Sequence, residues 1–236
     1  MQSTYWHLDG HTASLTLPSL SLAVDAKMPG EGLRNIRVLD RYWPNGRLFG
    51  VTGPIQSAAK CELADLYVRG DVLIAAYETG QPDAARIDLH WRAVKPAEGD
   101  SHIARIDLLV SIRTDRLDWR HDVCLESLIP AADECSEFSS NSNWFAGNDW
   151  GWSLDLMVHS SDLRRREIKS ALGLPGARLL RYELFPTEML EKGVILRARA
   201  AALFLHAGAE AMAMVRYQRA HLAEKMFLAA DPPLGI

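Results

Sequence analysis

One histidine and a group of glutamates in this sequence could carry acid-base chemistry. His159 follows a segment of alternating polar and apolar residues, and an imidazole titrates near neutrality, as a general acid or base requires. Glu183, Glu188 and Glu191 lie around residues 185–187, and a buried carboxylate among them would suit a general base. The alternative is that the histidine is structural and the carboxylates lie at the surface. His159, Glu183 and Glu191 are the catalytic candidates, with Glu188 beside them.

Tryptophans gather in one stretch of the chain. Trp144, Trp150 and Trp152, three of the seven tryptophans, fall between residues 138 and 162, and Trp43 lies in an earlier aromatic segment. Indoles offer flat apolar faces on which the C–H faces of sugar rings can pack. The alternative is that they belong to a hydrophobic core. Trp144 and Trp150 lie among polar residues, which favours a ligand-binding platform.

His90 and Arg92 form a third group of candidates. They alternate with apolar residues and share the polar side of an expected strand with Asp88. These two side chains could bind a ligand, or they could form ordinary surface pairs with the carboxylate.

Motifs for nucleotides, zinc or a serine nucleophile are absent from the sequence. Asp155 and His159 share a strand face, but four residues of strand separate them by about 13 Å, too far for one metal ion. The three cysteines have no metal-ligand or disulfide spacing. We expect no metal and no cofactor, and a site assembled between strands.

The elements that must position these residues are mostly strands. Residues 63–94 alternate between apolar and polar residues and contain turn residues, which predicts hairpins. Strands are also expected at residues 152–158, after a loop, and at residues 178–185. Residues 193–206 are expected to form a central strand. Residues 163–171 follow a Ser-Ser-Asp cap and predict a short helix, and residues 210–227 predict a C-terminal helix. The expected fold is an all-β, antiparallel β-sandwich with little helix.

Composition sets the outer bounds. The chain has 236 residues, 48% of them hydrophobic and 24% charged, and its length and lack of a linker predict one domain over residues 1–236. A net charge of −4 disfavours nucleic acid. The longest apolar run is too short to span a bilayer, and the first residues do not form a signal peptide. We therefore expect a cytoplasmic protein without membrane contact; the residues do not specify its oligomeric state.

Several short segments resemble the galactose mutarotase-like supersandwich. They are Leu-Thr-Leu-Pro at 15–18, Pro-Gly-Glu-Gly-Leu at 29–33 and Leu-Glu-Lys-Gly-Val at 190–194. Residues 67–71 and 157–162 are also similar to bacterial proteins of unknown function with this pattern. The resemblance implies a sugar-binding groove on a concave sheet and, in active mutarotases, a histidine acid and a glutamate base.

Three functions remain open from the sequence. The first is a carbohydrate-binding β-sandwich with a groove lined by Trp150, Trp152, His159 and Arg92. The second is a sugar epimerase or mutarotase-like isomerase in which His159 works with a glutamate from residues 183–191. The third is a scaffold or assembly subunit that uses its aromatic loop. Whether the protein is an enzyme is undecided at this point.

Overall fold

A computed structural model describes residues 4–55, 61–80, 85–96, 102–120, 122–130, 134–139, 142–146, 150–171, 173–187 and 189–206. These ranges are built almost wholly from strands, and their one helical element is the 3₁₀ turn η1 (Pro29–Glu31). None of their helical structure is therefore long enough to cross a bilayer. The all-β expectation is confirmed. The helix expected at residues 210–227 lies outside the described residues.

One large sheet has the strand order β1-β2-β3-β4-β6-β12-β17-β16, with β5 paired to β4, so that nine described strands take part. Their bounds are β1 (Trp6–Asp9), β2 (Thr12–Leu17), β3 (Leu20–Asp25), β4 (Leu33–Val38), β5 (Arg41–Tyr42), β6 (Arg47–Thr52), β12 (Cys124–Ile129), β16 (Leu163–Ser170) and β17 (Arg178–Leu184).

The second large sheet joins eight described strands in the order β13-β14-β15-β19-β10-β9-β8-β7. Their bounds are β7 (Cys61–Arg69), β8 (Val72–Thr79), β9 (Ala85–Val94), β10 (His102–Thr114), β13 (Glu134–Ser139), β14 (Ser142–Ala146), β15 (Trp152–Val158) and β19 (Ile195–His206). A small ribbon pairs β11 (Trp119–Arg120) with β18 (Met189–Leu190). The pairings between these described strands are all antiparallel.

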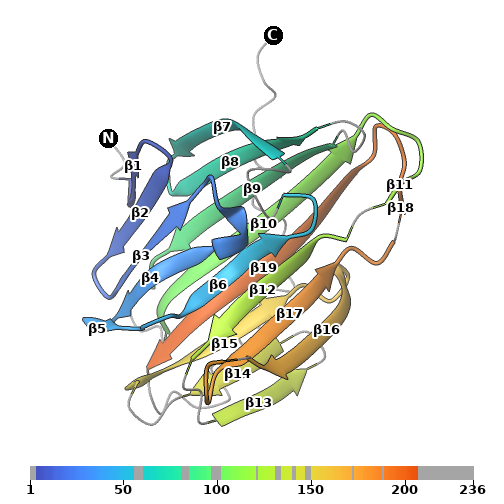
Figure 1. Ribbon diagram of the computed structural model, residues 1–236. Coiled ribbons are helices and arrows are strands. Elements are labelled where there is room, and N and C mark those ends of the chain that lie inside the picture. Colours follow the sequence, from blue (N-terminus) through green and yellow to red (C-terminus); the bar gives the residue numbers. More distant parts are fainter. Residues whose placement is uncertain are drawn as a thin grey trace.

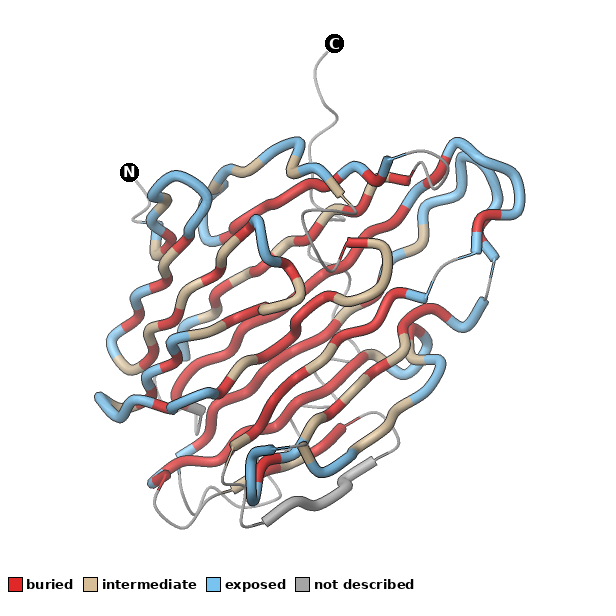
Figure 2. Tube along the Cα trace, in the orientation of Figure 1, coloured by how far each residue is buried: buried red, intermediate tan, exposed pale blue. Residues whose placement is uncertain are grey.

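The two large sheets lie face to face as a sandwich (Figure 1). Strand β9 shows why: Ile87, Leu89 and Trp91 are fully buried, whereas the residues between them are only half-buried. Such alternation gives each strand one apolar side, which two stacked sheets bury against each other. Figure 2 shows the buried residues along the strands and the exposed ones mainly at the turns. We call the side of the eight-stranded sheet that points away from its partner its outer face.

One core cluster draws residues from both sheets, from Trp6 to Phe204. The expected central strand at residues 193–206 is confirmed as β19, which lies between β15 and β10. The hairpins expected at residues 63–94 are confirmed as β7, β8 and β9. The single domain over residues 1–236 stays a prediction.

The prediction of a helix at residues 163–171 was wrong. This segment is the edge strand β16, hydrogen-bonded along one side to β17. The carboxylate of the expected cap, Asp162, instead accepts hydrogen bonds from Arg199 on β19. A sheet partner decides strand formation more strongly than local propensity does. The charged residues that suggested an exposed helix face are also common on edge strands, where they hinder pairing with other chains.

Candidate functional site

Three indoles from distant parts of the chain meet at one end of the sandwich. Trp43 follows β5 in the nine-stranded sheet, Trp150 precedes β15, and Trp152 begins it. The rings of Trp150 and Trp152 stack with centroids 4.6 Å apart. Trp43 meets each of them edge-on, with centroids 5.4 Å apart. The indoles thus join the two sheets, and Trp43, Trp150 and Trp152 are 4%, 9% and 3% exposed.

A tight turn holds Trp43 in this position. The Trp43 amide donates to the Ile36 carbonyl at 2.8 Å, and the chain then turns through Asn45, whose φ is +59°. A Cβ on Gly46 would lie 2.3 Å from Cε3 of the Trp43 ring, so only glycine fits beneath the indole. The turn that the Asn-Gly pair predicts is therefore also the support of the ring.

The indoles line a cleft of about 220 Å³, which we call the aromatic cleft. Its lining residues are Arg41, Tyr42, Trp43, Pro44, Pro130, Trp150 and Trp152. Tyr42 is 51% exposed, whereas the indoles are largely buried. Because Trp150 and Trp152 cover each other's facing sides, a ligand could meet only their remaining surface. The cleft is apolar inside, with a phenol and a guanidinium among its lining groups.

Trp144, the third indole of the original stretch, is not part of this cleft. It lies on β14 opposite Asp155 of β15, on the outer face of the eight-stranded sheet. There it packs against Leu203 and Leu205, a small apolar group separate from the main core. Residues 144 and 152 therefore lie on opposite sides of the same sheet.

His90 and Arg92 lie on β9, also on the outer face. Arg92 donates to Asp107 of β10 at 2.6 Å, and Arg105 places its Nε 2.8 Å from the other oxygen of that carboxylate. Arg105 and Asp107 are 7% and 3% exposed, so this is a buried group of two guanidiniums and one carboxylate. Asp88, which the sequence suggested as a partner of His90 and Arg92, instead forms an ion pair with Arg86 at 3.0 Å.

Sequence reasoning missed Arg105 and Asp107 as candidates. The signal that could have found them is the word Ala-Arg-Ile-Asp-Leu, which occurs at 85–89 and again at 104–108. It places polar residues of β10 on the same side as those of β9, and the two strands are neighbours.

His159 directly follows β15 and belongs to a hydrogen-bonded group at the turn into β16. Its Nδ1 lies 2.8 Å from Ser161 Oγ, which donates to Asp162 at 2.6 Å. Arg199 Nε donates to the same carboxylate at 2.9 Å. Burial raises the pKa of Asp162, but the hydrogen bonds from Arg199 and Ser161 outweigh it, and the pKa lies below its ordinary value. The group ties the turn to β19.

The candidate glutamates do not adjoin His159. Glu183 lies on β17 of the nine-stranded sheet, opposite Arg165 and Cys124 on the flanking strands. Glu191 is exposed in the turn that leads to β19. Glu191 precedes β19, which begins at Ile195. The His159 amide bonds to the carbonyl of Arg199, and β19 covers about 13 Å between Ile195 and Arg199. Glu188 lies outside the described residues.

Among the described residues, no group of three His, Cys, Asp or Glu side chains could hold a metal ion. Cys61 is partly buried and Cys124 fully buried, and both are free thiols. Burial raises the pKa of each, which keeps them protonated at neutral pH.

Comparison with known proteins identifies the fold. No protein-family model and no curated protein matches the sequence. Among solved structures, the chain resembles a "putative mutarotase (YeaD)" from Salmonella typhimurium, with a TM-score of 0.51 and 7% identity over 83% of this chain and 90% of that one. A TPR-domain containing protein from Parabacteroides distasonis gives 0.62 and 9%, over 94% of this chain and 50% of that one.

A mutant of the heparan sulfate lyase HepC from Pedobacter heparinus gives a TM-score of 0.51 with 8% identity, over 84% of this chain and 36% of that one. The chain thus spans half or less of the TPR protein and the lyase, and most of YeaD. At these identities the likeness concerns the fold alone, a β-sandwich that also occurs in a protein described as a "putative mutarotase" and in a heparan sulfate lyase.

Proposed function

We propose that this protein is a carbohydrate-binding β-sandwich and that the aromatic cleft is its ligand site. The observation that carries the proposal is the meeting of Trp43, Trp150 and Trp152, supplied by two sheets, around one cleft. Sugar rings pack their C–H faces on aromatic side chains, and the Arg41 guanidinium and the Tyr42 hydroxyl supply groups for sugar hydroxyls. The cleft is smaller than the roughly 300–1,000 Å³ of ordinary ligand pockets, which fits a single ring.

The fold is in keeping with this function. YeaD is described as a "putative mutarotase" and HepC as a heparan sulfate lyase, so sandwiches of this kind occur in proteins whose descriptions name sugar chemistry. The likeness of the fold adds to the evidence from the cleft, which is the feature specific to this chain.

The two other functions have less support. An isomerase with His159 and a glutamate would need both groups around one sugar, whereas Glu183 belongs to the other sheet and Glu191 is exposed in a distant turn. An assembly role for the aromatic loop would need a protruding apolar surface, whereas Trp150 and Trp152, 9% and 3% exposed, line a recessed cleft in which Tyr42, 51% exposed, is the accessible ring. Carbohydrate binding, with no catalytic pair assigned, is therefore the proposed role.

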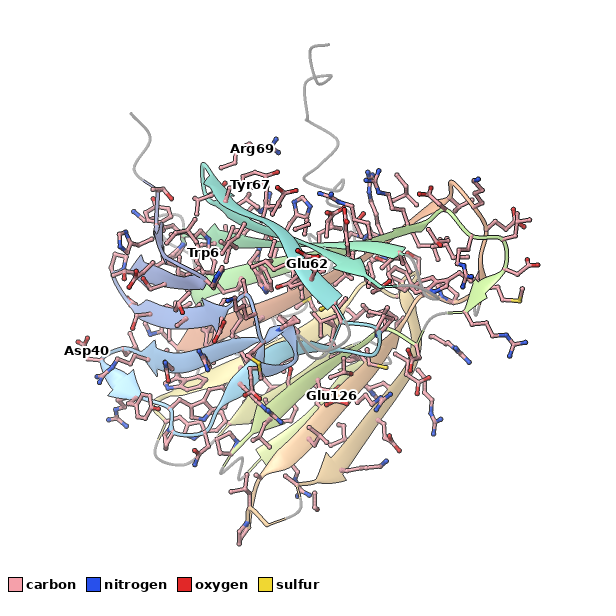
Figure 3. The ribbon with its side chains drawn as sticks, turned by 45° about the horizontal axis from the view of Figure 1, so that its top comes forward. Trp6, Asp40, Glu62, Tyr67, Arg69 and Glu126 are labelled. Carbon is pink, nitrogen blue, oxygen red and sulfur yellow. The ribbon has the colours of Figure 1, made fainter. Side chains whose placement is uncertain are left out.

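The test uses two exposed tyrosines as a matched pair. Tyr42 lines the aromatic cleft and is 51% exposed, and Tyr67 on β7 is 46% exposed. Figure 3 places Tyr67 near the top of the view and Asp40, which precedes β5, at its left edge. Removing either ring should leave the fold intact, so a difference in binding would report on the cleft.

A glycan array first screens the protein against immobilised sugars. A panel of monosaccharides is then tested in solution by thermal shift and calorimetry. We expect one class of neutral sugar to bind and, at a hundred times its dissociation constant, to stabilise the protein by about 2.7 kcal/mol. Tyr42→Ala should weaken binding about tenfold or more, whereas Tyr67→Ala should bind as the wild type does. If no sugar binds, or if both variants bind equally well, the aromatic cleft is not a carbohydrate site.

A further inference from the structure

A second cleft adjoins the first and shares Tyr42 of β5 with it. It has a volume of about 430 Å³, and we call it the polar cleft. Its lining residues are Glu31, Arg34, Asn35, Tyr42, Asn45, Gly46, Arg47, Leu128 and Leu174. Tyr42 lines both clefts, so the half-exposed phenol ring stands where one passes into the other. Gly46 also lines the polar cleft and supports Trp43 of the aromatic cleft.

The polar cleft is rich in hydrogen-bonding groups. Asn35 and Asn45 each offer an amide that can donate and accept. Arg34 donates from one terminal nitrogen, Nη2, to Asp25 at 3.2 Å. A guanidinium has five N–H donors, so this arginine retains donors for a ligand.

The charges in the polar cleft are already paired. Arg34 meets Asp25 at 3.2 Å, and Arg47 meets Glu31 at 3.2 Å. An acidic ligand would have to compete with these carboxylates and would gain little net attraction. A neutral ligand with many hydroxyls could use the remaining donors and acceptors without breaking either pair. The cleft is therefore better suited to a neutral sugar than to a uronic acid or a sulfated sugar.

The segment that separates the two clefts has an unusual backbone. Asn35, Leu39, Asp40 and Asn45 all have φ between +50° and +64°. Such conformations in non-glycine residues cost on the order of 1–3 kcal/mol each and are retained where the surrounding structure or a function requires them. Here they bend the chain sharply on both sides of Tyr42, so that the side chains of a short segment reach both clefts.

We infer that the two clefts are adjoining subsites for one neutral oligosaccharide. One ring packs in the aromatic cleft, the chain passes Tyr42, and the next ring lies in the polar cleft, where Asn35, Asn45 and Arg34 meet its hydroxyls. The inference rests on the proposed function and specifies its ligand class: a neutral chain of at least two sugars, rather than a monosaccharide or an acidic glycan.

The dependence of affinity on the number of sugars in the ligand tests this inference. Calorimetry compares glucose with cellobiose and cellotriose, and galactose, mannose and xylose with their β-linked disaccharides and trisaccharides. In the series that binds, the disaccharide should bind about tenfold more tightly than the monosaccharide, as one or two net hydrogen bonds would produce. The gain should persist in high salt, since no ion pair between protein and ligand contributes to it.

Asn45→Asp tests the polar cleft alone, because aspartate also tolerates a positive φ but lacks the amide donor. Thr16→Asp, at an exposed position on β2, is the matched control for the added charge. We expect the Asn45 variant to lose the gain from the second sugar while keeping its affinity for the monosaccharide, and the Thr16 variant to keep both.

The outcomes separate the two proposals. If no saccharide binds, the proposed function fails. If a monosaccharide binds as tightly as its oligomers, or if Asn45→Asp keeps the gain, the aromatic cleft stands and the second subsite fails. If digalacturonate or a sulfated disaccharide binds more tightly than the neutral disaccharides, the assignment to neutral chains is wrong.

Discussion

Asp107 shows how much the role of a single residue depends on its cross-strand neighbours. Its carboxylate lies between Arg92 and Arg105, 2.6 Å from the first and 2.8 Å from the second, and the residue is 3% exposed. Removing one partner from a buried ionic group leaves the others uncompensated in a medium of low dielectric constant. We therefore expect Asp107 to contribute to the stability of the fold, independently of any function of the outer face.

Asp107→Asn should lower the free energy of unfolding by about 3–5 kcal/mol, because two guanidiniums would lose their carboxylate. The comparison is Asp65→Asn, which breaks an ion pair with Arg86 at 3.2 Å in which Asp65 is 54% exposed. A surface pair of this kind contributes about 1 kcal/mol or less. Urea denaturation measures the free energy of unfolding of both variants. Similar decreases in the two would show that the buried ionic group contributes no more than the surface pair.

At the scale of the element, a strand's face and its neighbours decide what its side chains can reach. Trp152 points to the core, whereas His159, seven residues later, lies on the opposite side, beside Arg199. A groove that contained both would need to pass through the sheet. The turn between β15 and β16 is instead held by Asp162, whose carboxylate bonds to β19 rather than capping a helix.

The pH dependence of stability should report on this turn. The pKa of Asp162 is lower in the folded protein than its ordinary value, so its ionised form stabilises the fold above the unfolded pKa of about 3.9 and this contribution is lost as the pH falls through the folded pKa. Asp162→Asn should be less stable than the wild type at pH 7, and the gap should narrow below pH ~4.

The measurement is urea denaturation from pH 7 to pH 3. Asp40→Asn controls for the loss of one carboxylate, because Asp40 is exposed and asparagine tolerates its φ of +64°. A gap that stays constant over this range would contradict the assigned role of the Asp162 carboxylate.

At the scale of the whole molecule, the sandwich is joined by polar as well as apolar contacts. Tyr77 on β8 donates to the carbonyl of Ala26, beyond β3, at 2.8 Å. Tyr182 on β17 donates in the other direction, to the carbonyl of Leu156 on β15, at 2.8 Å. Both rings are fully buried, and burial raises the pKa of the Tyr77 hydroxyl, which keeps it a donor. Each tyrosine therefore links one sheet to the other.

Tyr77→Phe and Tyr182→Phe should each lower the free energy of unfolding by about 1–3 kcal/mol, because a buried carbonyl loses its donor while the ring remains. The two tyrosines lie near opposite edges of the sandwich, so their effects should add to within about 0.5 kcal/mol in the double variant. Tyr67→Phe, at an exposed position, is the control. Denaturation that leaves both single variants as stable as the control would show that these bonds do not hold the sheets together.

The sequence by itself determined the strand class and, for segments such as residues 85–94, the side of the strand that faces the core, because alternation with a period of two is a local property. It also identified Trp43, Trp150 and Trp152 as candidates. Only the tertiary structure decided that these indoles share a cleft, that Trp144 does not, and that Asp107 pairs with Arg92. It also decided that residues 163–170 are a strand rather than a helix. The physical reason is the same in each case: alternation does not specify which strands become neighbours, and sheet pairing joins segments that are distant in the chain.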